Sequence, residues 1–296
     1  MAAALAASGV FVRDLLGRRD DPRLAAVGVD AVVLATPDGV VAAVAAAIEP
    51  SDGAVVLHLS GSLGLDVLAP HPRVGSLHPL VPLPDPEIGM RRLLSGATFA
   101  VDGDPLAAEL VRRLGGRALR VDPRRRAAYH AAACMASNHV VALLGQVERV
   151  AASAGLGLDA FIDLARFAVD DVAERGTVAA LTGPAARGDV ATLDRHRAAL
   201  DPEEVAAYDA MVGLARRLAG RGALDPDLLH TRRAMSTTHQ PVCSPSVPSV
   251  PSVPSVPSVP SVPSVPSVPS VPSVPLAPVA PVVPVVPTER LAVPCS

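Results

Sequence analysis

The residues best suited to chemistry lie between Tyr129 and Asn138, in the stretch YHAAACMASN. The segment that this stretch opens is rich in Ala, Val and Leu and contains no proline as far as residue 154, which predicts a long helix. At about 100° per residue, four polar side chains share roughly a third of the helix circumference. They are His130, Cys134, Ser137 and Asn138. Because buried polar groups need partners, this stripe must face a hydrogen-bonding network, a cleft or a second chain.

The amino-acid composition limits which side chains can transfer protons. The chain contains no lysine, so all 26 basic residues are arginines. An arginine side chain stays protonated and cannot act as a general acid near neutral pH. Proton transfer must therefore depend on His, Tyr, Cys, Asp or Glu. The three cysteines, at positions 134, 243 and 295, have neither metal-binding nor disulfide spacing, and we predict no metal site.

Charge and hydropathy argue against two classes of partner. The formal net charge is −3, and the one basic cluster is RRR at residues 124–126, so we expect no nucleic-acid binding. The longest apolar run, Val40 to Ile48, is too short to span a bilayer, so we expect no membrane insertion. The first residues lack the basic region of a signal peptide. We therefore expect a cytoplasmic protein.

Up to residue 122, short apolar stretches alternate with helical ones. This alternation predicts an α/β fold with a doubly wound parallel sheet. The expected strands cover residues 10–16, 31–35, 54–59, 74–77, 97–101 and 118–121. In such sheets ligands bind outside the carboxyl ends of the strands. The polar or turn-forming residues expected at those ends are Thr36, Pro37, Asp38, Ser60 and His78. Loops after strands are commonly polar, so the argument depends on the set rather than on any one residue.

Two arginines, Arg18 and Arg19, follow what would be the second strand of a dinucleotide-binding fold. An acidic residue there binds the ribose hydroxyls of NAD, whereas an arginine accepts the extra phosphate of NADP. The alternative is a solvated arginine pair before a loop. We expect the first strand and the glycine-rich pyrophosphate loop to be missing, because the sequence starts within the helix that would follow them.

After Asp122 the pattern becomes wholly helical, which predicts a helical bundle beside the sheet. Asp189 is a natural N-cap for a helix over residues 190–200. Arg187, just before that helix, could bind an anion or pair with a neighbouring carboxylate. If His130 and Asn138 line a cleft shared with the sheet, they should face the loop ends that carry Ser60 and His78.

A three-residue repeat starts at Ser244 and places proline at every third position from Pro245 to Pro275. This repeat suits an extended polyproline II conformation but not a helix or a sheet core. We expect a disordered tail, either a spacer or a translated nucleotide repeat, which is dispensable for stability. The predicted organisation is a truncated dinucleotide-binding domain (1–122), a helical domain (123–222), and a linker with the low-complexity tail (223–296).

Four motifs carry a resemblance to a known family: HLSGSLGLDVL, GSLHPLVPLPDP, AAYHAAACMASNHVVALLGQVE and LTGPAARGD. In this order they resemble the bacterial Rossmann-like proteins whose second half is known as domain of unknown function 2520. The wider group includes pyrroline-5-carboxylate reductase, 6-phosphogluconate dehydrogenase and prephenate dehydrogenase. The resemblance extends to about Gly220 and implies an NADP-type Rossmann-like domain followed by a helical domain that forms a homodimer.

Residues and resemblance together predict an NADP-dependent oxidoreductase acting on a small anionic carbonyl, imine or hydroxyacid. His78 or His130 would transfer the proton. In the wider group a lysine often precedes the catalytic asparagine by one turn, but here Cys134 has that place before Asn138. The expected cofactor-binding residues are Arg18, Arg19, Thr36, Pro37, Asp38 and Ser60, and the expected substrate-binding residues are Ser137, Thr182 and Arg187.

The alternative is a non-catalytic Rossmann-like binding or regulatory protein that has lost its cofactor. The missing glycine loop favours this alternative, whereas the polar residues at the strand ends favour the enzyme.

Overall fold

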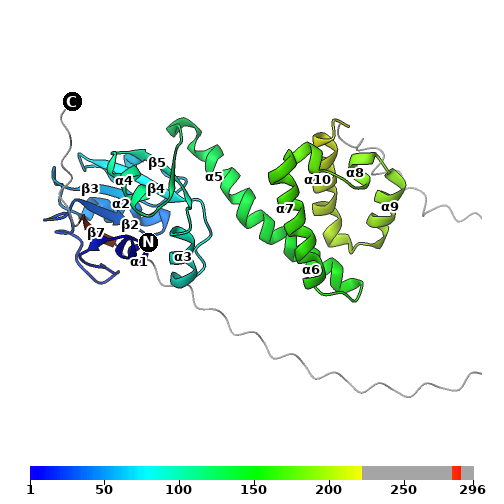
Figure 1. Cartoon of the computed structure of the whole chain (residues 1–296), viewed down its shortest axis with the longest axis horizontal. Helices are drawn as coiled ribbons and strands as arrows, with labels where there is room; N and C mark the ends of the chain where they lie inside the picture. Colours follow the sequence, from blue (N-terminus) through cyan, green and yellow to red (C-terminus); the bar gives the residue numbers. More distant parts are fainter. Residues whose placement is uncertain (222–281, 288–296) are drawn as a thin grey trace, which may run out of the picture. The chain divides into compact units, whose positions relative to one another are not determined.

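The computed structural model describes residues 1–221 and the backbone of residues 282–287 (Figure 1). The chain divides into two compact units, and the first contains residues 1–141 and the C-terminal strand. The domain boundaries expected from the sequence, after residues 122 and 222, stay a prediction. The helix that begins at Arg126 is fastened to the sheet by that residue's buried side chain.

The first unit is built on a seven-stranded sheet in the order β1-β7-β2-β3-β4-β5-β6. Its α/β class is the one that the sequence predicts, and six strands lie where the sequence places them. The strands are β1 (Val10–Val12), β2 (Ala31–Leu34), β3 (Val55–His58), β4 (Val74–Pro79), β5 (Thr98–Gly103), β6 (Arg117–Arg120) and β7 (Val282–Pro287).

Strand directions in the sheet are mixed. β2, β3 and β4 are parallel to one another, and so are β5 and β6. However, β5 runs antiparallel to β4, and β7 runs antiparallel to both of its neighbours. The alternation of strands and helices predicts a doubly wound parallel sheet, which the parallel strands β2, β3 and β4 confirm, and the antiparallel pairs add to it. That alternation does not fix direction, because a connection that contains a helix can also return the chain antiparallel, as in many mixed sheets.

Helices cover both faces of the sheet, which explains why β2 and the first three residues of β3 are wholly apolar. On one face, Val33 and Leu57 belong to a core completed by α1, α3 and α4. On the other face, Val32 and Val56 pack with α2 and η1. These elements are α1 (Ala2–Ala7), α2 (Asp38–Ala47), η1 (Leu65–Leu68), α3 (Pro86–Leu93) and α4 (Leu106–Arg113).

Between β6 and residue 221 the regular elements of the chain are all helical, as the sequence predicts. A short 3-10 turn, η2 (Pro123–Arg125), leads into α5 (Arg126–Cys134), a π-helix η3 (Met135–His139) and α6 (Val140–Ser153). There follow α7 (Asp159–Ala180), α8 (Pro184–Arg187), α9 (Val190–Ala199) and α10 (Pro202–Leu218).

The N-cap residue predicted for the helix after Asp189 has the expected role. Asp189 caps α9 by accepting a hydrogen bond from the backbone N–H of Thr192 at 3.0 Å. Leu193 and Val212 form a small buried core with Ala185. Among the described helices, none has both the length and the apolar character needed to cross a membrane.

The predicted tail is only partly described. The Ser-Val-Pro repeat lies outside the described residues, as do Cys243 and Cys295. The exception is β7, which lies within the segment predicted to be disordered and pairs with two strands of the sheet.

Candidate functional site

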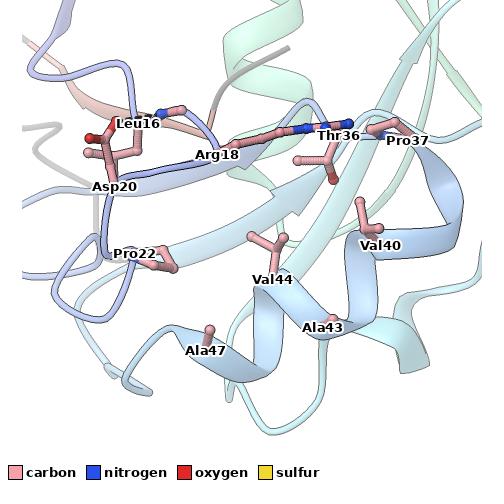
Figure 2. A pocket seen from close by; sticks show the side chains of 11 residues that line it. Leu16, Arg18, Asp20, Pro22, Thr36, Pro37, Val40, Ala43, Val44 and Ala47 are labelled. Carbon is pink, nitrogen blue, oxygen red and sulfur yellow. Dashed lines mark hydrogen bonds between the residues drawn. The ribbon is translucent and has the colours of Figure 1, made fainter. Parts of the chain in front are cut away.

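A pocket of about 370 Å³ opens beside the carboxyl end of β2 (Figure 2). One wall is the apolar face of α2, and the opposite wall is the loop that follows β1. Three of the predicted cofactor residues, Arg18, Thr36 and Pro37, line this pocket, whereas Arg19 does not. The apolar wall consists of Val40, Ala43, Val44 and Ala47.

The pocket contains polar groups suited to a ligand. The hydroxyl oxygen of Thr36 is buried and has no hydrogen-bond partner among the described residues. Leaving such a group unpaired costs about 1–3 kcal/mol, which a bound ligand can recover. The side chain of Arg18 extends toward Thr36 and Pro37 (Figure 2). Asp20 also lines the pocket, and its carboxylate accepts a hydrogen bond from the N–H of Gly17 at 2.7 Å.

The loop after β3 is held by the carboxylate of Asp38, at the start of α2. Its Oδ2 accepts hydrogen bonds from Ser60 Oγ at 2.8 Å and Ser62 Oγ at 2.6 Å. Ser60 Oγ in turn accepts the backbone N–H groups of Ser62 and Leu63, each at 3.1 Å. The structure thus brings Asp38 and Ser60 together from neighbouring strand ends, as expected for the rim of a ligand site.

A buried arginine fastens α5 to the sheet. Nη2 of Arg126 donates to the carbonyl of Ser60 at 3.0 Å and to Ser76 Oγ at 2.9 Å. Nη1 lies 3.8 Å from Asp102 Oδ2. The residue is 4% exposed, although it belongs to the basic cluster at residues 124–126. The sequence analysis did not identify Arg126 as a site residue, and only its place at the start of the first long helix after the predicted strands could have indicated a structural role.

This anchor places the start of α5 beside His78 in β4. Nδ1 of His78 lies 2.6 Å from the hydroxyl oxygen of Tyr129. The His78 and His130 rings are 5.8 Å apart between centroids, in an edge-to-face arrangement. The structure therefore joins the two predicted proton-transfer histidines into one cluster. It adds Tyr129, which stood at the head of the polar stretch but was not among the predicted site residues.

Burial keeps His78 and Tyr129 uncharged at neutral pH. Desolvation, followed by the charges of His130 and Arg126, lowers the pKa of His78 to about 4. Burial also raises the pKa of the Tyr129 hydroxyl. A neutral His78 and a protonated Tyr129 can share a hydrogen bond in either direction, according to the imidazole tautomer.

Gly61 makes the close approach of the two histidines possible. A Cβ atom at this position would lie 2.6 Å from His130 Cδ2 and 2.8 Å from His78 Nε2. Real Cβ atoms do not come so close to other heavy atoms, so any side chain at residue 61 would push the rings aside. The SGS sequence after β3 therefore has two roles. Gly61 leaves room for the two histidine rings, and Ser60 and Ser62 donate hydrogen bonds to Asp38.

The other polar residues of the stripe are arranged differently from the helical prediction. His130 and Cys134 remain neighbours, with 3.9 Å between Nε2 and Sγ. Beyond Cys134 the backbone forms the π-helix η3, so the spacing of about 100° per residue no longer holds. Ser137 donates to the carbonyl of Ala133 at 2.8 Å, and Asn138 is exposed.

Two predicted substrate residues belong to the second unit. Thr182 precedes α8, and Arg187 is the last residue of that helix; both are exposed. Their roles remain predictions. No group of His, Cys, Asp and Glu side chains in the described part of the chain could hold a metal ion.

Residues 97–214 match the family profile described as Domain of unknown function (DUF2520). This match confirms the resemblance that the sequence motifs indicate. None of the curated proteins matches the chain.

Two crystal structures share the fold. Protein TM1727 from Thermotoga maritima is 26% identical, with a TM-score of 0.53 over 64% of this chain and 77% of that one. A proposed NADP oxidoreductase, BF3122 from Bacteroides fragilis, is 18% identical, with a TM-score of 0.53 over 62% of this chain and 74% of that one. The chain is therefore similar to Rossmann-like proteins over most of their length.

Proposed function

We propose that this protein is an NADP-dependent oxidoreductase that reduces a small carbonyl or imine, or oxidises the corresponding hydroxy compound. The observation that carries the proposal is the alignment of two sites along one sheet edge. The pocket with Arg18 and Thr36 lies at β2, and the cluster of His78, Tyr129 and His130 lies at β4. The likeness to the Bacteroides fragilis protein supports the fold on which this reading depends.

The distance between the two sites suits a dinucleotide. The pocket extends from the end of β2 to the loop after β1. Neighbouring strands are about 4.8 Å apart, so the β1 side of the pocket and the cluster at β4, four places apart in the sheet, are separated by about 19 Å. An extended dinucleotide can cover this length with its adenosine at the pocket and its nicotinamide near Ser60 and His78. Thr36 Oγ1 and Arg18 would then bind the ribose and its phosphate.

Asp38 is better suited to positioning the loop after β3 than to binding the cofactor phosphates. A carboxylate at the start of α2 repels phosphate and already occupies that end of the helix. The hydroxyls of Ser60 and Ser62, which Asp38 orients, can bind ribose or amide groups instead. We therefore assign Asp38 to positioning of the loop and Ser60 to the nicotinamide half.

Tyr129 is the best candidate for the proton donor. When bound, the cofactor supplies the hydride. The Tyr129 O–H would protonate the substrate oxygen or nitrogen, and His78 Nδ1–H would return a proton to the phenolate across the 2.6 Å contact. His130, beside His78 and half-exposed, would connect the pair with solvent. The expected substrate-binding roles of Asn138, Ser137, Thr182 and Arg187 stay predictions from the sequence.

Titration of the intact chain with NADPH and NADH, followed by nicotinamide fluorescence, tests the cofactor assignment. We expect binding with preference for NADPH. Arg18→Ala should reduce NADPH affinity about tenfold and leave NADH affinity nearly unchanged, because it removes one charge-assisted contact to phosphate. Arg19→Ala is the matched control, since Arg19 lies outside the pocket and should bind as the unsubstituted chain does.

The same titration distinguishes the oxidoreductase from the alternative, a non-catalytic binding or regulatory protein. Failure of the intact chain to bind either nucleotide would favour the non-catalytic protein. Binding without NADPH consumption in the presence of small ketones, imines and 2-oxo acids would favour a cofactor-binding regulator. Turnover that persists in Tyr129→Phe would remove Tyr129 as the proton donor and leave His78 and His130.

The partner proposed for the second unit is another copy of the chain. α7 has no buried residue, and its exposed apolar side chains include Leu164 and Phe167, each 65% exposed. A patch of this kind on a helix marks an interaction surface. We assign it to a homodimer because the family resemblance implies dimerisation through the helical domain.

A further inference from the structure

The sheet of the first unit is completed by a strand from the far end of the chain. β7 lies between β1 and β2 and is antiparallel to both. Its register places Val286 opposite Phe11 and Val283 opposite Val33. Within the described sheet β1 pairs only with β7, so this strand alone connects β1 with the remainder.

The place of β7 is that of the first strand in a doubly wound fold. That fold has the strand order 3-2-1-4-5-6, with a phosphate-binding loop after the carboxyl end of strand 1. β7 runs in the opposite direction, and its last residue, Pro287, pairs with Val10 at the start of β1. Its carboxyl end therefore lies at the edge away from the pocket. β7 fills the place in the sheet without supplying a phosphate loop.

β1 and β2, the strands on either side of β7, need a strand paired between them. Val10 is 2% exposed, and Val32 and Val33 are fully buried, so the strands on either side belong to the core. With the gap empty, the facing N–H and C=O groups of β1 and β2 would be unpaired, which is costly in a core and invites another chain to bind.

The composition of β7 is unfavourable for a strand inside a sheet. Pro284 and Pro287 have no N–H, and proline is otherwise confined to edge strands and bulges because it removes a ladder hydrogen bond. Here both prolines lie in a strand whose neighbours occupy both sides, and Pro284 is opposite Val32. A peptide of the same length without proline would make more backbone hydrogen bonds in the same gap.

We propose that the gap between β1 and β2 is a strand-binding slot, filled by residues 282–287 of the same chain. The chemistry is β-augmentation, in which main-chain hydrogen bonds to an extended apolar peptide provide the affinity. If this proposal holds, residues 282–287 are an exception to the expectation that the tail is dispensable for stability. This proposal does not depend on cofactor binding, because it concerns only the completion of the sheet.

Cross-linking of the full chain tests the register and the identity of the donor. In a background with Cys134, Cys243 and Cys295 changed to Ser, F11C/V286C introduces two cysteines at paired register positions, which suits a disulfide. Phe11 is exposed, so the change spares the core. F11C/V285C is the control, because Val285 is paired with Val12 instead.

A disulfide in F11C/V286C that migrates as a monomer on a non-reducing gel, with none in the control, is the expected result. A disulfide-linked dimer would overturn the proposal, because the strand would then come from a second copy. Equal cross-linking in both variants, or none in either, would also overturn it, because the register would be wrong.

Thermal unfolding of the full chain tests how well the slot is filled. Val283→Pro with Val285→Pro removes two further N–H groups, and we expect the melting temperature to fall by at least about 4 °C. The control is Val262→Pro with Val265→Pro, in the repeat, which should change nothing. Pro284→Val should raise the melting temperature. No difference between the two double variants would show that residues 282–287 do not stabilise the sheet.

Discussion

At the scale of single residues, the main finding is that two histidines near the ligand edge are held neutral by burial. Desolvation lowers the pKa of His58 to about 4, as it does for His78. His58, at the end of β3, donates from Nε2 to the carbonyl of Gly64 at 3.2 Å. An uncharged ring suits this site because the neighbouring Arg126 already carries a buried positive charge.

These depressed pKa values predict how stability depends on pH. In the unfolded chain each histidine binds its proton near pH 6.5, whereas in the folded chain both stay neutral until about pH 4. The unfolded state therefore binds more protons within that window, and stability rises with pH. The contribution is complete above the unfolded pKa and is lost as the pH falls toward the folded pKa.

Melting curves at about pH 7.5 and about pH 5.5 measure this effect. We expect a lower melting temperature at the acidic value, and a smaller difference in the double variant H58Q/H78N. Those amides keep the Nε2 contact of His58 and the Nδ1 contact of His78 without titrating. His139→Gln, at an exposed residue, is the control and should retain the full pH dependence. A double variant with an unaltered dependence would mean that other groups cause it.

At the scale of elements, one arginine sets the position of α5. Arg126 ties the first turn of the helix to the ends of β3 and β4, and three residues later Tyr129 reaches His78. The π-helix η3 then ends the regular spacing of the polar stripe just after Cys134. π-helical turns inside α-helices are frequent at functional sites. The helix is thus anchored at its start and altered in pitch beyond the cluster.

Arg126→Met should destabilise the chain more than any change to the arginines beside it. The substitution leaves Ser76 Oγ and the carbonyl of Ser60 without their donor, at a cost of about 1–3 kcal/mol. Arg124→Met is the matched control, because Arg124 is exposed and its ion pair with Asp122 contributes little. Chemical denaturation of both variants measures the difference. Equal stability would show that α5 is held by other contacts.

At the scale of the whole molecule, association through α7 is the feature to measure. Light scattering coupled to size-exclusion chromatography should give a dimer for the intact chain. L164E/F167E should shift the mass to a monomer, because two charges on neighbouring helix positions cannot be buried unpaired. Arg166→Glu, on the same helix, should leave the mass unchanged. A monomeric intact chain, or a dimeric L164E/F167E variant, would contradict the proposed interface.

The sequence by itself determined the class of fold and most of its elements. Hydrophobic runs and turn residues report local backbone preference, so six strands and the helical second half follow directly from them. The Asp189 cap was predictable for the same reason, because its hydrogen bond to Thr192 spans only three residues. Polar residues at strand ends also follow from local pattern, and the sequence therefore identified Thr36, Ser60 and His78 as candidates.

The tertiary structure alone decided which of these residues meet and in what state. His78 and Tyr129 are 51 residues apart, and Arg126 is buried although it belongs to the basic cluster at residues 124–126. The strand β7 comes from a proline-rich segment whose local preference argues against a sheet. Each outcome depends on burial and on pairing between distant segments, and the free energies of desolvation and strand pairing exist only once the chain is folded.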